Sequence, residues 1–369
     1  MKKVLIDGSC IVTEAMARAG ADAFIGYPIT PANLLYQYAG RRFPLMIPAP
    51  DEITVVQWMS GLSACGRIPA TATSFPGFAL MLESINMAFM MELPMIIILV
   101  QRLGPATGTA TCGAQGDITL LRGMISGGHQ LPVLCPSGFT DCWKLGALSV
   151  SISAGLRSPV IFLTSKEMMM TVRSFDTDKL GILKPVKRVF YQGDDPYKSY
   201  QPAENGIPPF LPVTSSRWQV RLNASTHDNE GILQHSTPGA LDNTRRLDQK
   251  AVSRLPEYTF FDLDEQDGAC TIIMSYGITS AAAGEAVAAI RKRGIRVSLL
   301  VAKTLFPVPD KYYEILDRYE RVVIAEENIN AQYARILFGA RLPERVIVAG
   351  SIGKMVRRDE IIKKVISPL

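Results

Sequence analysis

The sequence lacks the paired cysteines that would hold a structural metal or an iron–sulfur cluster. Its six cysteines lie at positions 10, 65, 112, 135, 142 and 270, and none is followed by another at the C-x-x-C spacing. No secretory signal precedes them, because the first three residues lead into a short apolar stretch rather than a long h-region. We therefore expect free thiols in the reducing cytoplasm.

Three further absences narrow the classes of function. Neither G-x-G-x-x-G nor G-x-x-x-x-G-K-S/T occurs, so neither a dinucleotide-binding fingerprint nor a P-loop is supported. Only three histidines are present, without the H-E-x-x-H spacing; His129 could lie near a site, and we expect His227 and His235 to be surface or structural residues. No apolar run reaches the ~18 residues of a membrane span, and the longest, 95–100, has the length of a buried strand.

The composition is that of a globular chain with large buried surfaces. Of 369 residues, 47% are hydrophobic and 20% charged, and about 150 residues per domain predicts two or three domains. The mean hydropathy of +0.14 favours a subunit interface in addition to a core. The net charge of +5 is too small to indicate nucleic acid, although a weakly basic face could dock an acidic electron carrier.

Strand and helix signals alternate through residues 1–178, which predicts an α/β domain with an open parallel sheet covered by helices. The strands are expected at 3–7, 22–25, 71–74, 95–100, 131–134 and 160–164, and the helices at 12–19, 31–38, 52–65, 80–91 and through residue 147. Residues 179–262 are rich in turns and keep no period, so we expect an irregular connecting segment there. Further strands, at 270–276, 297–301, 322–325 and 346–348, predict a second, smaller α/β domain over 263–369.

The most informative segment is Gly26-Tyr27-Pro28-Ile29-Thr30-Pro31, directly after an apolar stretch. Its two prolines stiffen a loop that leaves a strand. Parallel sheets bind ligands at the carboxyl ends of their strands, so the hydroxyl of Thr30, held between the two prolines, is a candidate contact.

Two charged residues have both a structural and a functional interpretation. Glu52 begins an apolar helix, where it could simply favour the helix dipole beside an N-cap Asp51. Alternatively, apolar neighbours bury its carboxyl group, raise its pKa and let it hold a proton near neutral pH. Arg102 ends a buried strand and either binds a planar anion or forms a salt bridge to a loop carboxylate such as Asp117.

These stretches together resemble the alpha subunit of the 2-oxoacid:ferredoxin oxidoreductases, above all their 2-oxoglutarate branch. The resemblance spans nearly the whole chain. The residues that carry it are 26–31, Asp51-Glu52-Ile53, 71–74, 101–108, Gln115-Gly116-Asp117, 224–231, 305–309 and Glu326-Glu327-Asn328. It implies a pyrimidine-type thiamine diphosphate domain followed by a transketolase-C-terminal-like domain.

The resemblance also implies roles for individual residues. Glu52 would be the catalytic glutamate that hydrogen-bonds the aminopyrimidine ring of thiamine diphosphate, and Thr30 and Arg102 would bind the carboxylate and oxo oxygen of the substrate. The cofactor itself supplies the hard chemistry. Other residues expected to contact the cofactor are Tyr27, Pro28, Ile29, Ser74 and Phe75. Two departures from the family are Gly8-Ser9-Cys10-Ile11 at the start and Phe75, which stands where the family has glycine.

Two necessary parts are missing from the sequence: a Gly-Asp-Gly diphosphate motif and cysteines for a cluster. The resemblance therefore implies a beta subunit that carries Mg²⁺ and a 4Fe-4S cluster, with separate gamma and delta subunits. The implied reaction converts a 2-oxo acid, 2-oxoglutarate first, and coenzyme A to acyl-CoA and carbon dioxide, with ferredoxin as electron acceptor. Pyruvate, a branched-chain or an aromatic 2-oxo acid is the alternative substrate, and a non-catalytic scaffolding paralogue is the alternative function.

Overall fold

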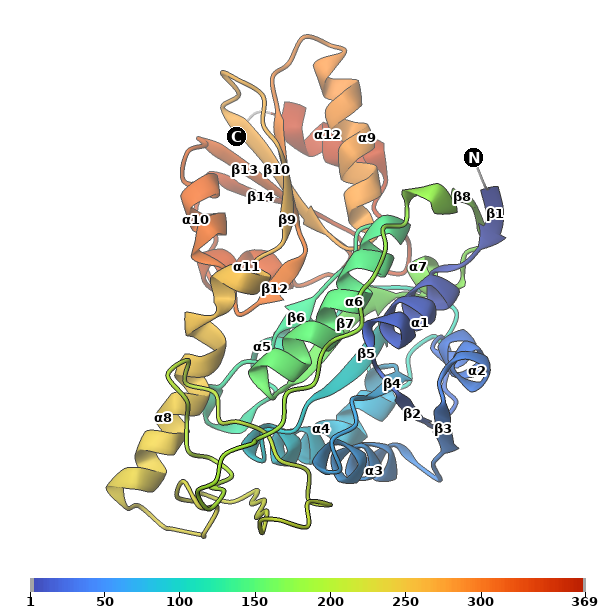
Figure 1. Cartoon of the computed structure of the whole chain (residues 1–369). Coiled ribbons are helices and arrows are strands. Elements are labelled where there is room, and N and C mark those ends of the chain that lie inside the picture. Colours follow the sequence, from blue (N-terminus) through green and yellow to red (C-terminus); the bar gives the residue numbers. More distant parts are fainter. Residues whose placement is uncertain (1–2, 368–369) are drawn as a thin grey trace.

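A seven-stranded sheet lies at the centre of the first domain in the computed structural model, which describes residues 3–367 (Figure 1). Its strand order is β12-β6-β7-β5-β4-β2-β3. The strands are β2 (Ala23–Gly26), β3 (Leu45–Pro48), β4 (Pro69–Thr73), β5 (Met95–Gln101), β6 (Val133–Leu134), β7 (Pro159–Ser165) and β12 (Thr304–Phe306). All pair in parallel except β12, which pairs antiparallel with β6. The predicted α/β class and parallel sheet are confirmed.

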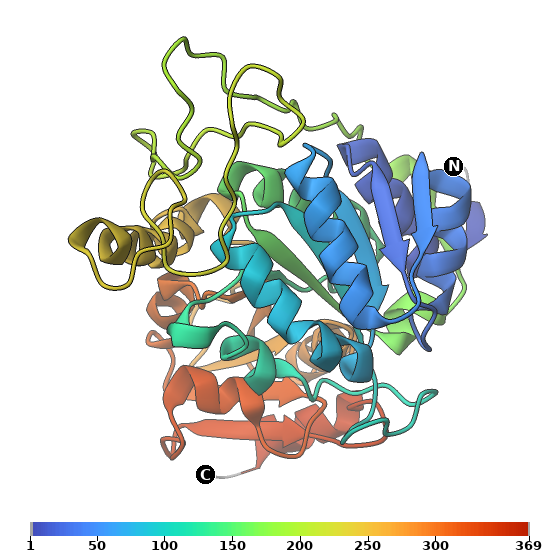
Figure 2. The ribbon, with the colours of Figure 1, turned by 90° about the horizontal axis from the view of Figure 1, so that it is seen from below.

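Helices cover both faces of this sheet because β5 is apolar on both sides. Ile96, Ile98 and Val100 belong to the core beneath α1, α2 and α6, whereas Ile97 and Leu99 belong to the core beneath α3 and α4. Figure 2 shows α3 and α4 side by side on one face. The helices of this domain are α1 (Gly8–Ala19), α2 (Asn33–Arg42), α3 (Glu52–Ala64), α4 (Phe75–Met90), α5 (Ile118–Arg122), α6 (Phe139–Leu156) and α7 (Lys166–Met170), with the short turn η1 (Ser126–Gly128).

Three expectations for the first domain are corrected. The strand expected at 3–7 forms, as β1 (Lys3–Ile6), but it pairs antiparallel with β8 (Arg173–Asp176) in a separate two-stranded sheet. The strand β3 was not predicted. Helix α4 begins at Phe75 rather than at residue 80, because Pro76 occupies its first turn, where no backbone donor is needed.

The second domain has a five-stranded sheet in the order β14-β13-β10-β11-β9. Its strands are β9 (Phe261–Asp264), β10 (Thr271–Tyr276), β11 (Ser298–Ala302), β13 (Arg321–Glu326) and β14 (Val346–Gly350). Helices α9 (Thr279–Arg291) and α12 (Arg358–Ile366) pack on one face, and residues of α10 (Asp310–Leu316) and α11 (Gln332–Phe338) join a core shared with the first domain. After β11 the chain returns to the first domain, where β12 adds a strand to the seven-stranded sheet. Residues of both sheets belong to one continuous apolar core.

The connecting segment is not wholly irregular, because residues Pro238–Ser253 form the helix α8 and the turn η3 (Leu255–Tyr258) follows it. A further turn, η2 (Thr177–Lys179), lies where the segment begins. Figure 1 shows the segment, green to yellow, along the outside of the first domain. A buried ion-pair cluster anchors it: Glu92, fully buried, accepts from Lys250 at 2.8 Å and from Arg246, both on α8. The two cations neutralise a carboxylate that could not otherwise be buried, and the pKa of Glu92 falls to about 2 although burial opposes this.

Candidate active site

Three neighbouring strands, β2, β4 and β5, bring the loop residues Thr30, Ser74 and Arg102 to one edge of the sheet. The Arg102 guanidinium Nη1 donates to the carbonyl oxygen of Thr30 at 2.6 Å. The Ser74 hydroxyl donates to the same oxygen at 3.4 Å. The parallel sheet therefore joins the stiff proline loop, the start of α4 and the end of β5 into one cluster, as the spacing of the motifs predicts.

Arg102 is buried, with 7% of its surface exposed, and its Nε–H has no partner. No carboxylate of residues 3–367 lies within ion-pair distance of it, so the alternative of a salt bridge to Asp117 is wrong. Burial lowers the pKa of the guanidinium, and the nearby Asp117 charge opposes this effect. A buried cation with a free donor is prepared to bind a planar anion in two-point geometry.

Asp117, expected from the sequence as a possible salt-bridge partner of Arg102 and as part of the Gln115-Gly116-Asp117 motif, is a second buried ionisable group at this edge. Its Oδ2 has no partner, while its backbone N–H donates to the side chain of Gln101 at 3.3 Å. Burial raises the pKa of Asp117 to about 7, and the Arg102 charge only partly offsets that rise. The carboxyl group therefore changes charge near neutral pH beside the anion-binding cation.

Glu52 is buried at the first position of α3, with 7% exposed. The N-cap role belongs to its neighbour Asp51, which accepts from the Thr54 N–H at 2.7 Å. Among residues 3–367 the Glu52 carboxylate has no hydrogen-bond partner. It lies over Gly77, where an added Cβ would come within 2.5 Å of Oε1, so the absence of a side chain at Gly77 makes room for it. This geometry leaves the Glu52 carboxylate available to a ligand, and the helix-cap role belongs to Asp51.

The cluster of Thr30, Ser74 and Arg102 has exposed residues on one side and a cavity on another. Tyr27 and Pro28 are exposed at the rim, and Ile29 and Thr30 are partly buried. Phe75 lines a cavity of about 400 Å³ between the two domains. The other lining residues include Leu103, Pro105, Asp117, Glu327 and Ile352. Tyr27 and Pro28 therefore leave one border of the cluster exposed to solvent.

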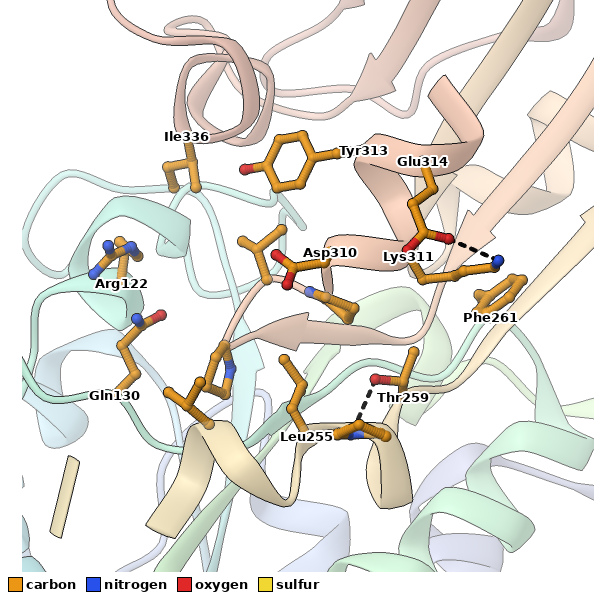
Figure 3. Close-up of a pocket in the computed structure, with 15 residues that line it drawn as sticks. Arg122, Gln130, Leu255, Thr259, Phe261, Asp310, Lys311, Tyr313, Glu314 and Ile336 are labelled. Carbon is orange, nitrogen blue, oxygen red and sulfur yellow. Dashed lines mark hydrogen bonds and ion pairs between the residues drawn. The ribbon is translucent and has the colours of Figure 1, made fainter. Parts of the chain in front are cut away.

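A larger cavity, about 820 Å³, lies elsewhere (Figure 3). Arg122 and Gln130 approach it from one side and Asp310 and Tyr313 of α10 from another, and none of the site residues expected from the sequence lines it. His129 also lies apart from the cluster, 3.5 Å from Asp248. His227 is structural as expected: it is fully buried and its Nε2 contacts Asn243 at 2.9 Å.

All six cysteines are free thiols, as expected. The described part of the chain holds no group of three or more His, Cys, Asp or Glu side chains that could bind a metal. Within residues 3–367, every helix is too short or too polar to cross a bilayer.

Comparison with known proteins identifies the class to which this fold and site belong. Residues 14–243 match the family described as pyruvate flavodoxin/ferredoxin oxidoreductase, thiamine diphosphate-binding, and residues 269–340 match the pyruvate:ferredoxin oxidoreductase core domain II. The first match covers more than half of the chain. The chain therefore belongs to the thiamine-diphosphate-binding family of the pyruvate flavodoxin/ferredoxin oxidoreductases.

Individual relatives of this chain are subunits of oxidoreductases that act on 2-oxo acids, by their names. The 2-oxoglutarate synthase subunit KorA of Methanocaldococcus jannaschii is 28% identical, over 99% of this chain and 100% of its own length. The ketoisovalerate oxidoreductase subunit VorB of Methanothermobacter thermautotrophicus is 26% identical, over 99% of this chain and 97% of its own length. The solved 2-oxoglutarate:ferredoxin oxidoreductase of Magnetococcus marinus, with 2-oxoglutarate, coenzyme A and succinyl-CoA bound, superposes with a TM-score of 0.91 at 25% identity, over 98% of this chain and 64% of that one. The resemblance to the oxidoreductase alpha subunits is confirmed.

The residues present fit the cofactor that the family implies. A buried carboxylate without a protein partner, held over a glycine, is what a hydrogen bond to an aminopyrimidine ring requires. Sequence reasoning missed the contribution of Gly77 and underrated Asp117. The motif Thr73-Ser74-Phe75-Pro76-Gly77 was the available signal for Gly77, but only the fold shows that this glycine faces Glu52.

Proposed function

We propose that this chain is the catalytic alpha subunit of an enzyme that oxidises a 2-oxo acid and coenzyme A to an acyl-CoA and carbon dioxide. Ferredoxin is the proposed acceptor of the two electrons, and 2-oxoglutarate is the favoured substrate. The observation that carries this proposal is the buried Arg102 guanidinium, bonded to the Thr30 loop and left with a free Nε–H. The names of the most similar relatives support 2-oxoglutarate.

Each residue of the site has a role in this proposal. Thiamine diphosphate, when bound, supplies a carbon nucleophile and takes up the electrons that the departing carboxyl group leaves. Glu52 would hydrogen-bond the aminopyrimidine ring, because its buried carboxylate has no competing partner among the described residues. Arg102 and the Thr30 hydroxyl bind the carboxylate and oxo oxygen of the substrate. Tyr27, Pro28, Ile29, Ser74 and Phe75 surround the cofactor.

The remaining parts are proposed to belong to a beta subunit. This chain has neither a diphosphate motif nor C-x-x-C cysteines, so Mg²⁺ and a 4Fe-4S cluster would lie on that partner. Separate gamma and delta subunits and a cytoplasmic location complete the proposal. The purified single chain should bind no iron and little thiamine diphosphate, and co-expression with the partner should restore both. Stoichiometric iron in the single chain would contradict this division.

A second substrate class has an observation in its favour. Apolar side chains of Phe75, Leu103 and Ile352 line the cavity that follows Arg102 in the chain. The carboxyl groups of Asp117 and Glu327 also line it, and no basic residue is among the described residues that do. Such a cavity fits an uncharged, branched or aromatic acyl chain better than a second carboxylate. The similarity to VorB agrees with this alternative.

The test is steady-state kinetics of the co-expressed complex with coenzyme A, a viologen dye and a panel of 2-oxo acids. The panel contains 2-oxoglutarate, pyruvate, 2-oxoisovalerate and phenylpyruvate. With the best substrate, Arg102→Ala should lower kcat/KM roughly 10²-fold, since a charge-assisted contact in a dry site is lost. Arg102→Lys should recover only part of this loss, because an ammonium cannot make the planar two-point contact. Thr30→Val, close in shape, should cost about tenfold.

Arg67→Ala is the control, because the Arg67 side chain is 43% exposed and forms its ion pair with the partly buried Asp22 at 3.4 Å. It should keep wild-type kinetics. Wild-type activity in Arg102→Ala would mean that the substrate carboxylate binds elsewhere. A complex that oxidises no 2-oxo acid would favour the scaffolding alternative.

A further inference from the structure

Two sequence motifs to which the proposed function assigns no role meet in the structure. Gln115-Gly116-Asp117 belongs to the first domain and Glu326-Glu327-Asn328 to the second. The Gln115 N–H donates to the Glu327 carbonyl at 2.9 Å, and the Glu327 N–H donates back to Gln115 Oε1 at 2.9 Å. The Asn328 side-chain amide donates to the Gln115 carbonyl at 3.2 Å. We call this set of contacts the interdomain clasp.

Gln115 is the centre of the clasp and is 1% exposed. Its Nε2 donates to the carbonyl of Tyr276 at 3.0 Å, and its Oε1 also accepts from the Thr279 hydroxyl at 3.1 Å. Gly277 between them has φ +59°, and an added Cβ would lie 2.9 Å from Gln115 Nε2. Both polar ends of the Gln115 side chain are therefore bonded to the second domain.

The second-domain half of the clasp is itself held in place by Glu326. Its buried carboxylate accepts from the side-chain amide of Asn328 at 2.6 Å and from the N–H groups of Tyr333 and Ala334 at 3.0 and 3.2 Å. Gln332 extends the clasp by donating to the Gly116 carbonyl at 2.8 Å. These bonds fix the loop that follows β13, so the clasp presents a rigid surface to the first domain.

Residues 112–117, which contain Gln115, also contact the two chain neighbours of Arg102. The Asp117 N–H donates to the side chain of Gln101, and the Leu103 N–H donates to the carbonyl of Cys112 at 2.8 Å. Both chain neighbours of Arg102 are thus bonded to residues 112–117. The Glu167 carboxylate holds the same segment by accepting from the Gly113 N–H at 3.1 Å. A displacement of Gln115 would reach Arg102 through these contacts.

We propose that Gln115 is a positioning residue for the reaction. Through it, the second domain sets where the Arg102 guanidinium and the Asp117 carboxyl group stand relative to the substrate carboxylate. This inference rests on the proposed function for the identity of that anion. Gln115 touches neither substrate nor cofactor, and it acts through the segment that ends at Asp117.

The test compares Gln115→Ala, Gln115→Glu and wild type in the co-expressed complex, with the best 2-oxo acid of the panel. Gln115→Ala should raise KM for the 2-oxo acid roughly tenfold and change kcat less than about threefold, because a looser cation binds the ground state less well. Gln115→Glu keeps an oxygen that accepts from Glu327 and Thr279 but loses the donor to Tyr276. The KM of Gln115→Glu should therefore lie between those of wild type and Gln115→Ala.

Asn86→Ala is the matched control. The Asn86 side-chain amide makes a similar set of hydrogen bonds away from Arg102. It donates to the Leu82 and Met124 carbonyls at 2.8 and 3.0 Å and accepts from the Ser126 N–H. It should lower thermal stability without changing KM. Hydrogen–deuterium exchange should rise several-fold in peptides covering 101–117 for Gln115→Ala and stay at the wild-type level there for Asn86→Ala.

A KM in Gln115→Ala within twofold of wild type would overturn the inference, whatever the change in melting temperature. Unchanged exchange over 101–117 would overturn it independently of any activity. If wild type itself oxidises no 2-oxo acid, the proposed function fails, while the exchange measurement still decides whether Gln115 fixes the Arg102 segment.

Discussion

Replacing Asp117 by asparagine should make the free energy of unfolding less dependent on pH. Burial raises the pKa of Asp117 from 3.8 to about 7 in the folded chain. Between these values the folded state holds a proton that the unfolded state has lost. The stabilising contribution of Asp117 to the free energy of unfolding is therefore complete below about pH 4. It declines as the pH rises and is fully lost above about pH 7.

The magnitude follows from the size of the shift. About three pKa units at roughly 1.4 kcal/mol each give a total on the order of 4 kcal/mol, of which about 2 kcal/mol falls between pH 5.5 and 8. The asparagine side chain cannot ionise, so Asp117→Asn should be more stable relative to wild type at pH 8 than at pH 5.5 by about 2 kcal/mol. Glu327, whose pKa burial also raises to about 7, contributes the same trend to both proteins and cancels in this comparison.

The assay is urea unfolding of wild type and variant at pH 5.5 and pH 8, with Asp194→Asn as control. Asp194 is 97% exposed, and its replacement should leave the pH dependence unchanged. The same ionisation should weaken substrate binding as Asp117 becomes an anion beside Arg102, so KM should rise between pH 6 and 8 in wild type and less in the variant. A variant that keeps the wild-type pH slope within about 0.5 kcal/mol would refute the assignment of this titration to Asp117.

Three other substitutions test the site and its support. Glu52→Gln should preserve the complex but slow proton exchange at C2 of bound thiamine diphosphate by about 10²-fold or more; normal exchange would return Glu52 to a helix-cap role. Gly77→Ala should displace the Glu52 carboxylate and lower kcat about tenfold or more, whereas Gly61→Ala, where an added Cβ meets no atom within 4 Å, should not. Equal kinetics for the two variants would contradict the packing argument. Glu92→Gln removes the buried counter-charge of Lys250 and Arg246, and it should cost about 3–5 kcal/mol in unfolding free energy, against about 0–1 for the exposed pair in Glu257→Gln. Similar losses would mean that the buried cluster does not anchor α8.

Local patterns in the sequence were enough to predict most strands of both sheets and to single out Thr30, Glu52 and Arg102. The strand β5 is apolar throughout because both of its faces are buried, and that pattern is visible in the sequence alone. Each of the three site residues stands shortly after a strand signal or at a helix start. The rule that parallel strands place their carboxyl ends at one edge of a sheet predicted that such residues gather there.

Elements whose stability depends on distant partners were not predictable in this way. Helix α8 has few apolar positions, because its buried face includes Lys250, which is satisfied by Glu92 rather than by an apolar core. The strand at 3–7 carries a strand pattern, but nothing local says that its partner is β8 instead of the central sheet.

The local sequence determined the chemical groups of this protein, namely a carboxylate at a helix start, a guanidinium at a strand end and a hydroxyl in a proline loop. Only the tertiary structure decided their environment. Gln115 meets Glu327 from 212 residues away, and the pKa of Asp117 rises because chain segments far apart in sequence exclude water around it. Burial and electrostatics depend on what surrounds a group in space, which a local sequence pattern does not contain.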